Sequence, residues 1–327
     1  MRIPSMVSFA RTISLAQRGI KNYFLKKPFC VSFEVTRSCN ARCKHCHLGG
    51  TVDEERRALP RKYGELCREL KPVVAQVSGG EPLLRRDLEQ IIEALKIPDR
   101  APYIVVTTNG TLLTKERYSR LREAGVDDFS LSLDYPDDRH DEFRGVPRLF
   151  KRIEALMEEL KSENDKGITL SCVVQSDNFR EMVRMAELSR KWNVSLNFST
   201  YTPLRTQDKG FMLSKEESAE LKEIIRHLLD LKKKYKNIYT SDYVFKNMIE
   251  FFEKGFLPNC RAGERFLVVN PDGSLTPCGL IIKKYKNQKE IKQEFMKNNE
   301  CEYCYTSIRA NSEKPAKYLI MDSIKSL

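Results

Sequence analysis

Short apolar runs alternate with amphipathic segments from residue 29 to about residue 205. Short apolar runs rich in β-branched residues are typical of buried strands, whereas apolar residues spaced three and four apart are typical of covering helices. The runs predict strands at 29–35, 73–78, 103–108, 127–134, 167–174 and 194–200. The amphipathic segments predict helices at 60–70, 82–96, 114–124, 147–162, 178–191 and 214–235. Alternating strands and helices form parallel sheets, so we expect an α/β fold, a partial (β/α)6 barrel of TIM-like plan spanning residues 29–205.

Residues 1–28 form a separate basic segment. Its apolar residues recur at helical spacing, at Met6, Phe9, Ala10, Ile13, Ala16, Ile20 and Phe24, while Arg11, Ser14, Arg18 and Lys21 fall on the other side. No acidic residue precedes Glu34. In the commonest arrangement, such a helix packs its apolar stripe on the protein core. It can also lie on an anionic membrane surface, or bind a partner.

The chain beyond the barrel changes composition twice. Residues 206–258 are polar, helical and lysine-rich, and they predict a linker to a small cysteine-rich domain at 259–305. In that domain two strand-like runs flank Asn-Pro-Asp-Gly at 270–273, a turn signal that predicts a hairpin. We expect residues 306–327 to form a C-terminal tail.

Polar residues at the carboxyl ends of the strands are candidates for chemistry, because the sites of such barrels lie there. The third strand ends in Thr107, Thr108 and Asn109. The fourth strand carries Ser130, Ser132 and Asp134 in alternation with apolar residues. This alternation predicts that the polar side chains point into the lumen. Asp134 can instead cap the turn before Pro136.

Composition narrows the class of protein. A chain of 327 residues can bury a sizeable core without disulfides. Ten cysteines, without a secretory signal or a long apolar run, predict a reducing cytoplasm. The net charge of +12 accompanies 31% charged residues of both signs, which indicates solvated helix surfaces more than a nucleic-acid site. Cys30, Cys67 and Cys172 lie within regular elements, where we expect buried thiols.

Three cysteines follow the first strand at C-x3-C-x2-C spacing, namely Cys39, Cys43 and Cys46. Thiolates are soft ligands that suit zinc or iron–sulfur clusters. Structural zinc normally takes four ligands, so three thiolates leave one position open, as in a four-iron cluster with one free iron. The alternatives are a zinc loop completed by His45 or His47, and three unrelated thiols.

A glycine pair and a carboxylate, Gly79, Gly80 and Glu81, end the second strand, and Gly79 lies 33 residues after Cys46. Glycines allow the backbone to approach a ligand closely, and a carboxylate offers an acceptor to an ammonium group. This segment is therefore a candidate for binding a ligand beside the cysteines.

A second group of cysteines lies beyond the barrel. Cys260 and Cys278 flank the expected hairpin, which would bring their thiols together, and Cys301 and Cys304 form a C-x2-C pair. The group supplies four ligands and leaves no open position. Its spacing permits a zinc ribbon with four cysteine ligands.

Together these motifs resemble the radical SAM superfamily, and the resemblance covers residues 29–304. It implies that Cys39, Cys43 and Cys46 hold a [4Fe–4S] cluster whose free iron is chelated by S-adenosylmethionine (SAM). It also implies that Gly79, Gly80 and Glu81 hold the methionine amine, and that Ser132 and Asp134 contact the ribose. Thr108 and Asn109 are further candidates for binding this cofactor.

Two more features resemble the SPASM and twitch group of that superfamily. The segment His140-Asp-Glu-Phe-Arg144-Gly145 makes Arg144 a candidate for a carboxylate or SAM contact, with a surface salt bridge as the alternative. The group usually has a glycine where this chain has Arg148, so the path of the loop is open. The spacing from Gly273 to Cys278, followed by C-x2-C, matches the twitch pattern. It implies an auxiliary [4Fe–4S] cluster at Cys260, Cys278, Cys301 and Cys304.

The resemblance implies an enzyme that takes electrons from a low-potential donor of the ferredoxin or flavodoxin type. It would cleave SAM to a 5′-deoxyadenosyl radical that abstracts hydrogen from the substrate. A fully ligated second cluster favours net oxidation or cross-linking of a small molecule or lipid, with a ribosomal peptide or protein as the alternative. A zinc-bearing nucleic-acid-binding protein is the alternative of a different class. We expect a cytoplasmic protein without a nucleic-acid partner, and the first 28 residues add a candidate peripheral membrane contact.

Overall fold

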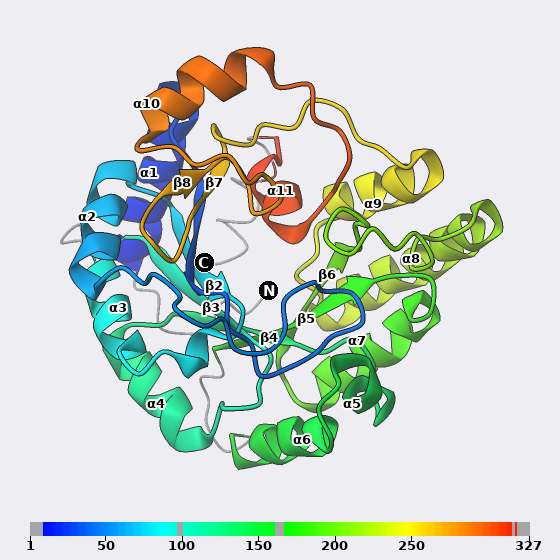
Figure 1. Ribbon diagram of the computed structural model, residues 1–327. Helices are drawn as coiled ribbons and strands as arrows, with labels where there is room; N and C mark the ends of the chain where they lie inside the picture. Colours follow the sequence, from blue (N-terminus) through cyan, green and yellow to red (C-terminus); the bar gives the residue numbers. More distant parts are fainter. Residues whose placement is uncertain (1–8, 97–100, 161–166, 316–317, 319–327) are drawn as a thin grey trace.

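The computed structural model describes residues 9–96, 101–160, 167–315 and 318. Six parallel strands form the barrel wall (Figure 1), and each predicted strand is confirmed with its ends within two residues. They are β1 (Cys30–Thr36), β2 (Val74–Gly79), β3 (Tyr103–Thr108), β4 (Asp128–Ser132), β5 (Ile168–Val174) and β6 (Ser195–Thr200).

The predicted helices are also present on the outside of this wall. They are α2 (Pro60–Leu70), α3 (Leu88–Leu95), α4 (Lys115–Ala124), α6 (Leu149–Glu159), α7 (Met182–Lys191) and α8 (Lys215–Tyr235). Short 3-10 turns, η1 (Pro82–Leu84) and η2 (Phe179–Glu181), precede α3 and α7. The short helix α5 (Arg139–Arg144) was not predicted, and it lies between β4 and α6.

The sheet has the order β6-β5-β4-β3-β2-β1-β7-β8. The predicted hairpin is confirmed as β7 (Phe266–Val269) and β8 (Leu275–Thr276), which pair antiparallel. Because β7 pairs parallel to β1, the hairpin continues the sheet of the barrel. After it come α10 (Gln288–Glu290), a π-helical turn η3 (Ile291–Phe295) and a 3-10 turn η4 (Met296–Asn298).

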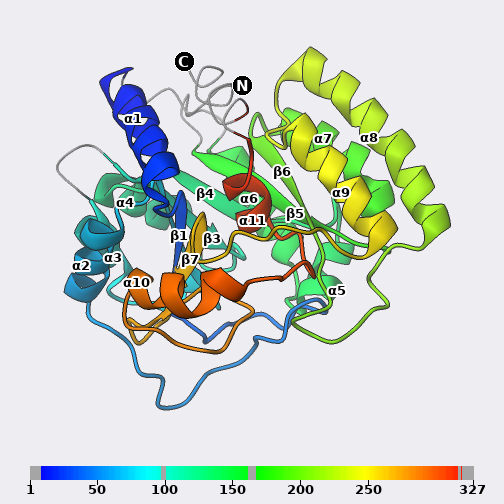
Figure 2. The same cartoon turned by 90° about the horizontal axis from the view of Figure 1, so that it is seen from above.

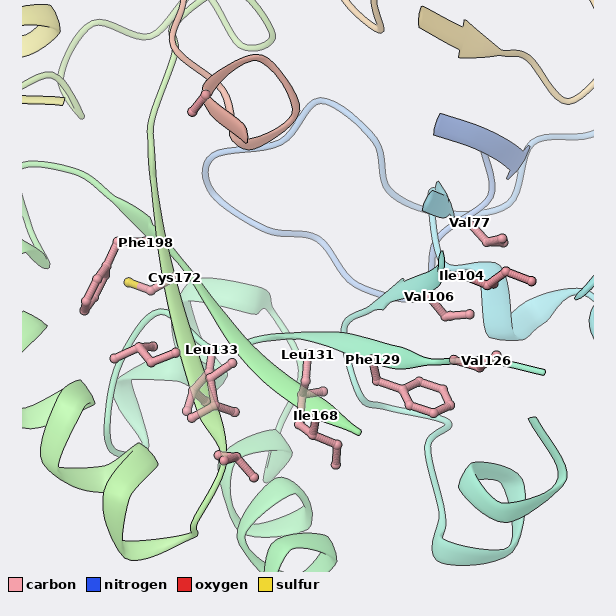
Figure 3. Close-up of a cluster of buried hydrophobic side chains, with 14 of the residues drawn as sticks. Val77, Ile104, Val106, Val126, Phe129, Leu131, Leu133, Ile168, Cys172 and Phe198 are labelled. Carbon is pink, nitrogen blue, oxygen red and sulfur yellow. The ribbon is translucent and has the colours of Figure 1, made fainter. Parts of the chain in front are cut away.

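The two faces of the sheet differ in chemistry. Side chains that face the outer helices are apolar and at most 1% exposed, as for Val77, Val106 and Phe129 (Figure 3). On the lumen face, the hydroxyls of Ser32 and Ser78 lie 2.8 Å apart, and other polar side chains line the neighbouring strands. Ser130 and Ser132 are half-buried between fully buried neighbours, which agrees with the predicted alternation.

The prediction of a linker at 206–258 is wrong. The segment contains α8 and α9 (Asp242–Lys254), which pack on each other, and α8 also packs on α7. Leu221, Ile225 and Leu228 of α8 join the main core, as do Phe245, Met248 and Phe251 of α9. The many lysines of α8 made the segment polar on average, which is why the sequence predicted a linker and not a helix that covers the core.

The prediction of a tail from residue 306 is also wrong for its first part. Helix α11 (Ser307–Ser312) contacts both β6 and β7, and it lies in the opening between them (Figure 1). The hydroxyl of Thr200, at the end of β6, donates to the carbonyl of Tyr305. The end of the chain therefore helps to close the barrel as far as residue 315; residues 319–327 lie outside the described residues.

Helix α1 (Phe9–Leu25) lies at the amino-terminal end of the strands, opposite the loop that follows β1 (Figure 2). Its polar side faces the barrel: Arg11 pairs with Asp127, and Asn22 donates to the carbonyls of Pro28 and Lys71 at 2.8 and 2.9 Å. Its apolar side faces outward, with Ile20 54% and Phe24 77% exposed. The expectation that the apolar stripe packs on the core is therefore wrong for these residues. Met6 lies outside the described residues.

No helix in the described part of the chain has the length and apolar character needed to span a bilayer.

Candidate functional site

The loop with Cys39, Cys43 and Cys46 leaves the carboxyl end of β1 and crosses the mouth of the barrel. Its start is closed by a pair of backbone hydrogen bonds between Cys39 and Gly50, at 3.0 and 2.9 Å. Burial raises the pKa of the Cys39 thiol, and the nearby Cys43 and Cys46 thiols add to this effect. The Cys39 thiol thus lies near the other two thiols, as expected of a common site.

Gly79 and Gly80 bring the end of β2 against this loop. The amide of Gly80 donates to the carbonyl of Thr36 at 2.7 Å, and the amide of Glu81 donates to that of Ser38 at 2.9 Å. A Cβ on Gly79 would lie 2.1 Å from the Thr36 oxygen, and one on Gly80 would lie 2.1 Å from the Ser38 oxygen. Both glycines are therefore required by the protein's own backbone, whether or not a ligand also approaches them.

We expected the Glu81 carboxylate to be open to a ligand, but it accepts its hydrogen bonds from the protein itself. Its side chain is fully buried, and one carboxylate oxygen accepts from the Thr108 hydroxyl at 2.7 Å and from the Leu83 amide at 3.1 Å. The other oxygen accepts from the Asn109 amide at 2.7 Å. Burial raises the pKa of Glu81 to about 7, against these hydrogen bonds. Glu81 thus joins the ends of β2 and β3, and Thr108 serves the same junction.

Asn109 carries this junction to the cysteine loop. Its side-chain amide donates to the Cys39 sulfur at 3.8 Å and to the side-chain oxygen of Asn40 at 2.9 Å. The sulfur of Cys39 therefore has an N–H donor that the buried Glu81 holds in place.

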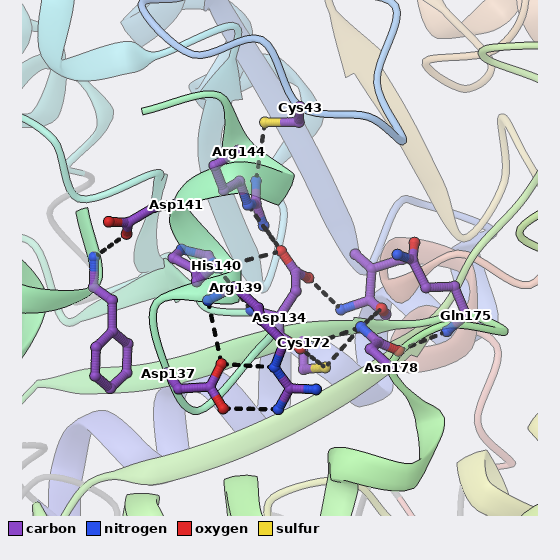
Figure 4. Close-up of polar contacts among 12 residues, drawn as sticks. Cys43, Asp134, Asp137, Arg139, His140, Asp141, Arg144, Cys172, Gln175 and Asn178 are labelled. Atoms are coloured by element: carbon purple, nitrogen blue, oxygen red, sulfur yellow. Dashed lines mark hydrogen bonds and ion pairs between the residues drawn. The ribbon is translucent and has the colours of Figure 1, made fainter. Parts of the chain in front are cut away.

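Asp134 and Arg144 form a buried ion pair beside Cys43 (Figure 4). The guanidinium of Arg144 donates to one carboxylate oxygen of Asp134 at 2.8 Å through Nε and at 2.5 Å through Nη2. Its Nη1 donates to the Cys43 sulfur at 3.5 Å. The surface salt bridge considered for Arg144 is wrong, because its side chain is 7% exposed and that of Asp134 is fully buried. Asp134 does more than cap a turn.

Helix α5 also holds the cysteine loop through its backbone. The amides of Arg42 and Lys44, on either side of Cys43, donate to the carbonyls of Arg144 and Phe143, both at 3.0 Å. Gly145 permits this approach, because its φ is +63° and a Cβ there would lie 3.1 Å from the Arg42 oxygen. Arg148, which stands where the group usually has a glycine, takes the left-handed conformation (φ 60°, ψ 23°) that suits a glycine.

His45 and His47 were the candidates to complete a zinc site. His45 stacks on Phe143 with ring centroids 4.9 Å apart, and burial lowers the pKa of His45 to about 4. Its buried Nδ1 has no hydrogen-bond partner. Among the described residues, no three His, Cys, Asp or Glu side chains are grouped to hold a single metal ion. A four-iron cluster spaces its cysteine ligands more widely than one ion does, and three mutually close thiols with N–H donors to two sulfurs fit such a cluster.

The second group of cysteines is also brought together. Cys260 forms a side-chain hydrogen bond with Cys301, which lowers the pKa of Cys301. Burial raises the pKa of Cys278 to about 11, and the Cys304 and Cys301 thiols contribute to that rise. The four thiols therefore lie near one another, with Cys301 close to both Cys260 and Cys278. By contrast, Cys30, Cys67 and Cys172 are buried thiols within regular elements, as expected, although Cys260 and Cys278 pack against the small apolar cluster that contains Cys30.

Arg309 is a structural residue of this second site that the sequence did not reveal. It is 2% exposed, and it donates to the carbonyls of Leu257 at 2.9 Å and Pro258 at 2.8 Å, and also to that of Cys304. Its Nε pairs with Glu313 at 2.9 Å. Arg309 thus ties together the segments that carry Cys260 and Cys304. Arg309 is the third residue of α11, which was not predicted from the sequence, and no motif in the sequence distinguishes it.

The chain is similar to known proteins in sequence and in fold. The family model described as "Radical SAM superfamily" matches residues 33–189. The chain is 28% identical over 281 residues to an AdoMet-dependent heme synthase of Methanosarcina barkeri, covering 78% of this chain and 77% of that protein. It is 28% identical over 291 residues to a probable GTP 3′,8-cyclase of Methanococcus aeolicus, covering 80% and 91%.

Solved structures share the fold. The crystal structure of Streptococcus suis SuiB bound to S-adenosylmethionine has a TM-score of 0.63 at 17% identity. The match covers 81% of this chain and 64% of the SuiB chain, so this chain spans just under two thirds of SuiB.

Proposed function

The chain belongs to the radical SAM superfamily of enzymes, and from this premise we propose that Cys39, Cys43 and Cys46 hold its SAM-binding [4Fe–4S] cluster. When bound, the cluster supplies the electron that cleaves SAM, a reaction that in this superfamily yields the 5′-deoxyadenosyl radical. The observation that carries the proposal is the convergence of three thiols with N–H donors from Asn109 and Arg144, which come from two other segments.

The chain's own residues bind and orient the cofactors in this proposal. The backbone of Gly79 and Gly80 lies against the start of the cysteine loop, where it can receive the methionine part of SAM. Ser132 remains available for a ribose contact from the lumen, since it is half-buried and carries no described hydrogen bond from its side chain. Asp134 is engaged with Arg144 and Val173, so its influence on SAM is indirect.

The test is replacement of Cys39, Cys43 and Cys46 together by alanine in anaerobically reconstituted protein. Reductive formation of 5′-deoxyadenosine from SAM should be lost, while it persists in the control Cys67→Ala, which removes a buried thiol outside both groups. Unchanged SAM cleavage in the triple variant would disprove the assignment.

For the second site we propose an auxiliary [4Fe–4S] cluster on Cys260, Cys278, Cys301 and Cys304. Four protein ligands leave no position for a substrate, so a role in electron transfer fits better than substrate binding. Accepting one electron from a substrate radical would give a net oxidation. A zinc ion on the same four thiols is the competing assignment, and metal analysis separates the two.

As substrate we propose a small molecule. The names of the two relatives given above specify heme and GTP, both small molecules, whereas SuiB has been solved with its precursor peptide and shares only the fold with this chain. A lipid is less well supported, because α1 lies at the end of the barrel opposite the cysteine loop. Stimulation of 5′-deoxyadenosine formation above the substrate-free rate, tested with GTP, heme precursors and peptides, would identify the class.

We also propose that α1 rests on an anionic membrane surface. Ile13, Ile20 and Phe24 lie on its outward side and are 41%, 54% and 77% exposed. Lys21 and Lys26 are exposed near its carboxyl end. Burial lowers the pKa of Lys292, and the nearby Lys27 and Lys26 lower it further, so these cations lie close together. An apolar stripe beside a group of cations is what an in-plane membrane helix requires. Such contact would station the enzyme at a membrane with its cysteine loop turned away from the bilayer.

A further inference from the structure

A continuous polar contact runs from the carboxylate of Asp134 through the guanidinium of Arg144 to the sulfur of Cys43 (Figure 4). The carboxylate lies 2.8 Å from Nε, and the sulfur lies 3.5 Å from Nη1 on the same planar group. One arginine thus joins a buried carboxylate to one thiol of the cysteine loop.

The position of the guanidinium is fixed from several sides. The second oxygen of Asp134 accepts from the Val173 amide at 3.0 Å, and the amide of Asp134 donates to Nδ1 of His140 at 3.2 Å. The carbonyl of Arg144 accepts from the Arg42 amide at 3.0 Å, one residue before Cys43. Neither the acid nor the arginine can turn away without breaking several buried contacts.

The charges in this group are shielded from water. Asp134 is fully buried and the side chain of Arg144 is 7% exposed. The pKa of Asp134 lies below its usual value although burial acts to raise it, chiefly because Arg144 stabilises the carboxylate. His140 stays neutral, because burial lowers its pKa to about 3. Ionic interactions at such a site are weakly screened and act strongly over short distances.

We propose that the Asp134–Arg144 pair sets the reduction potential of the cluster on Cys39, Cys43 and Cys46, a proposal that rests on the function proposed above. Reduction adds one electron from a low-potential donor, which is oxidised by one electron, and no bond or proton is exchanged. The added negative charge spreads onto the cysteine sulfurs. A cation that donates to the Cys43 sulfur stabilises the reduced form and raises the potential, while the buried carboxylate limits this rise. Arg144 is then a positioning and tuning residue.

The two partners must act with opposite sign. Arg144→Gln removes the cation and leaves the Asp134 carboxylate near the cluster, so the potential should become more negative. Asp134→Asn leaves the cation uncompensated, so the potential should become more positive. The double variant Asp134→Asn/Arg144→Gln is neutral and should lie between the two single variants. A merely structural role for the pair would not produce shifts of opposite sign.

The experiment measures the potential of reconstituted, SAM-free full-length protein by EPR at a series of poised potentials. Adding SAM to a separate sample identifies the primary cluster, because SAM changes only the signal of the cluster that binds it. We expect each single variant to shift the reduction equilibrium at least tenfold, which is 59 mV for one electron. The matched control is Arg139→Gln on the same helix, where Arg139 is half-exposed and pairs with Asp137 and Glu181.

Potentials unchanged in both single variants, or shifted in the same direction, would overturn the proposal. An unchanged potential with weaker SAM binding in Arg144→Gln would also overturn it, and would make Arg144 a SAM contact. Should Arg144→Gln fail to retain iron, Arg144→Lys keeps the charge without the planar fork, and Asp134→Asn must still raise the potential. Failure of the proposed function looks different: no EPR signal then responds to SAM, even in the wild-type protein.

Discussion

The carboxylate of Glu81 accepts the backbone amide of Asn109 at 2.7 Å, and the side chain of Asn109 donates to the sulfur of Cys39. A buried acid at the end of β2 therefore holds a donor at the end of β3 against the cysteine loop. Burial raises the pKa of Glu81 to about 7 from its ordinary value of 4.5.

This raised pKa gives a testable pH dependence. Between about pH 4.5 and 7 the folded protein binds a proton at Glu81 that the unfolded chain releases, so the contribution of Glu81 to stability falls as pH rises through this window. In Glu81→Gln this dependence should vanish. The free energy of unfolding of the variant minus that of the wild type should therefore increase as pH rises, by about 3 kcal/mol at most.

Denaturant unfolding of the metal-free protein at pH 5, 6, 7 and 8 measures this difference. The buried Asp128, whose pKa burial also raises, is present in both proteins and cancels. A constant difference between the two proteins across the window would show that Glu81 is not protonated on folding.

The glycine at position 80 should tolerate no side chain. Gly80→Ala places a methyl group 2.1 Å from the carbonyl oxygen of Ser38, a backbone atom that cannot move without displacing the cysteine loop. We expect a loss of about 3 kcal/mol in stability and poor retention of iron. The matched control is Gly19→Ala in α1, where the nearest atom would lie at 3.6 Å. There the helix should gain up to about 1 kcal/mol. Equal effects of the two substitutions on thermal unfolding would refute the close approach at β2.

Several parts of this arrangement follow from the sequence, for physical reasons. Buried parallel strands are short and apolar, so β1 to β6 were found within two residues. The capping residues Thr114 and Ser214 stand directly before α4 and α8, which fixes those helix starts. Cysteine spacing identified both thiol groups, because ligands of one cluster must lie within reach of one another.

Other parts depend on partners that are far away in the chain. The sequence gives no sign that the Glu81 carboxylate would accept hydrogen bonds from Thr108 and Asn109. It also gives no sign that Arg144 would reach Cys43, 101 residues away. The amphipathic stripe of α1 was recognised, but its orientation was not, because the outcome depends on the pairing of Arg11 with the distant Asp127. Periodicity identifies the faces of a helix and leaves open which face is buried.

The auxiliary site should be separable from the primary one. Replacing Cys260, Cys278, Cys301 and Cys304 together by alanine should lower bound iron from about eight to about four atoms per chain, if each site holds four irons. Reductive cleavage of SAM should continue without substrate turnover. Finding zinc in this domain of anaerobically prepared protein would contradict a redox role.

Arg309 should support that site without ligating metal. Arg309→Met removes donors to three carbonyls and leaves the largely buried Glu313 without its ion-pair partner, so we expect a loss of about 3 kcal/mol or more. Bound iron should fall toward half while the SAM-responsive EPR signal remains. Arg180→Met is the control, because Arg180 forms exposed ion pairs with Glu220 and Glu217, which contribute little to stability. Loss of the primary signal in Arg309→Met would mean that the residue supports the whole fold instead.

The outward face of α1 gives the last prediction, which concerns membranes. Each basic residue near an anionic leaflet contributes about 1 kcal/mol, and the exposed Ile20 and Phe24 can add apolar contact. The full chain should co-sediment with anionic vesicles at low salt, much less at high salt, and weakly with neutral vesicles. Deleting the first 26 residues would also remove Arg11 and Asn22 from the base of the barrel, so point variants are the sharper test.

Ile20→Gln/Phe24→Gln should leave the fold intact, because both side chains are more than half exposed, and it should reduce vesicle binding at least tenfold. Leu59→Gln is the matched control, since Leu59 is 73% exposed at the start of α2, away from α1. Equal sedimentation of wild type and the α1 double variant, or none by either, would show that the exposed apolar residues of α1 do not bind the membrane. Loss in the Leu59 variant alone would place the lipid contact near the mouth of the barrel and would reopen the case for a lipid substrate.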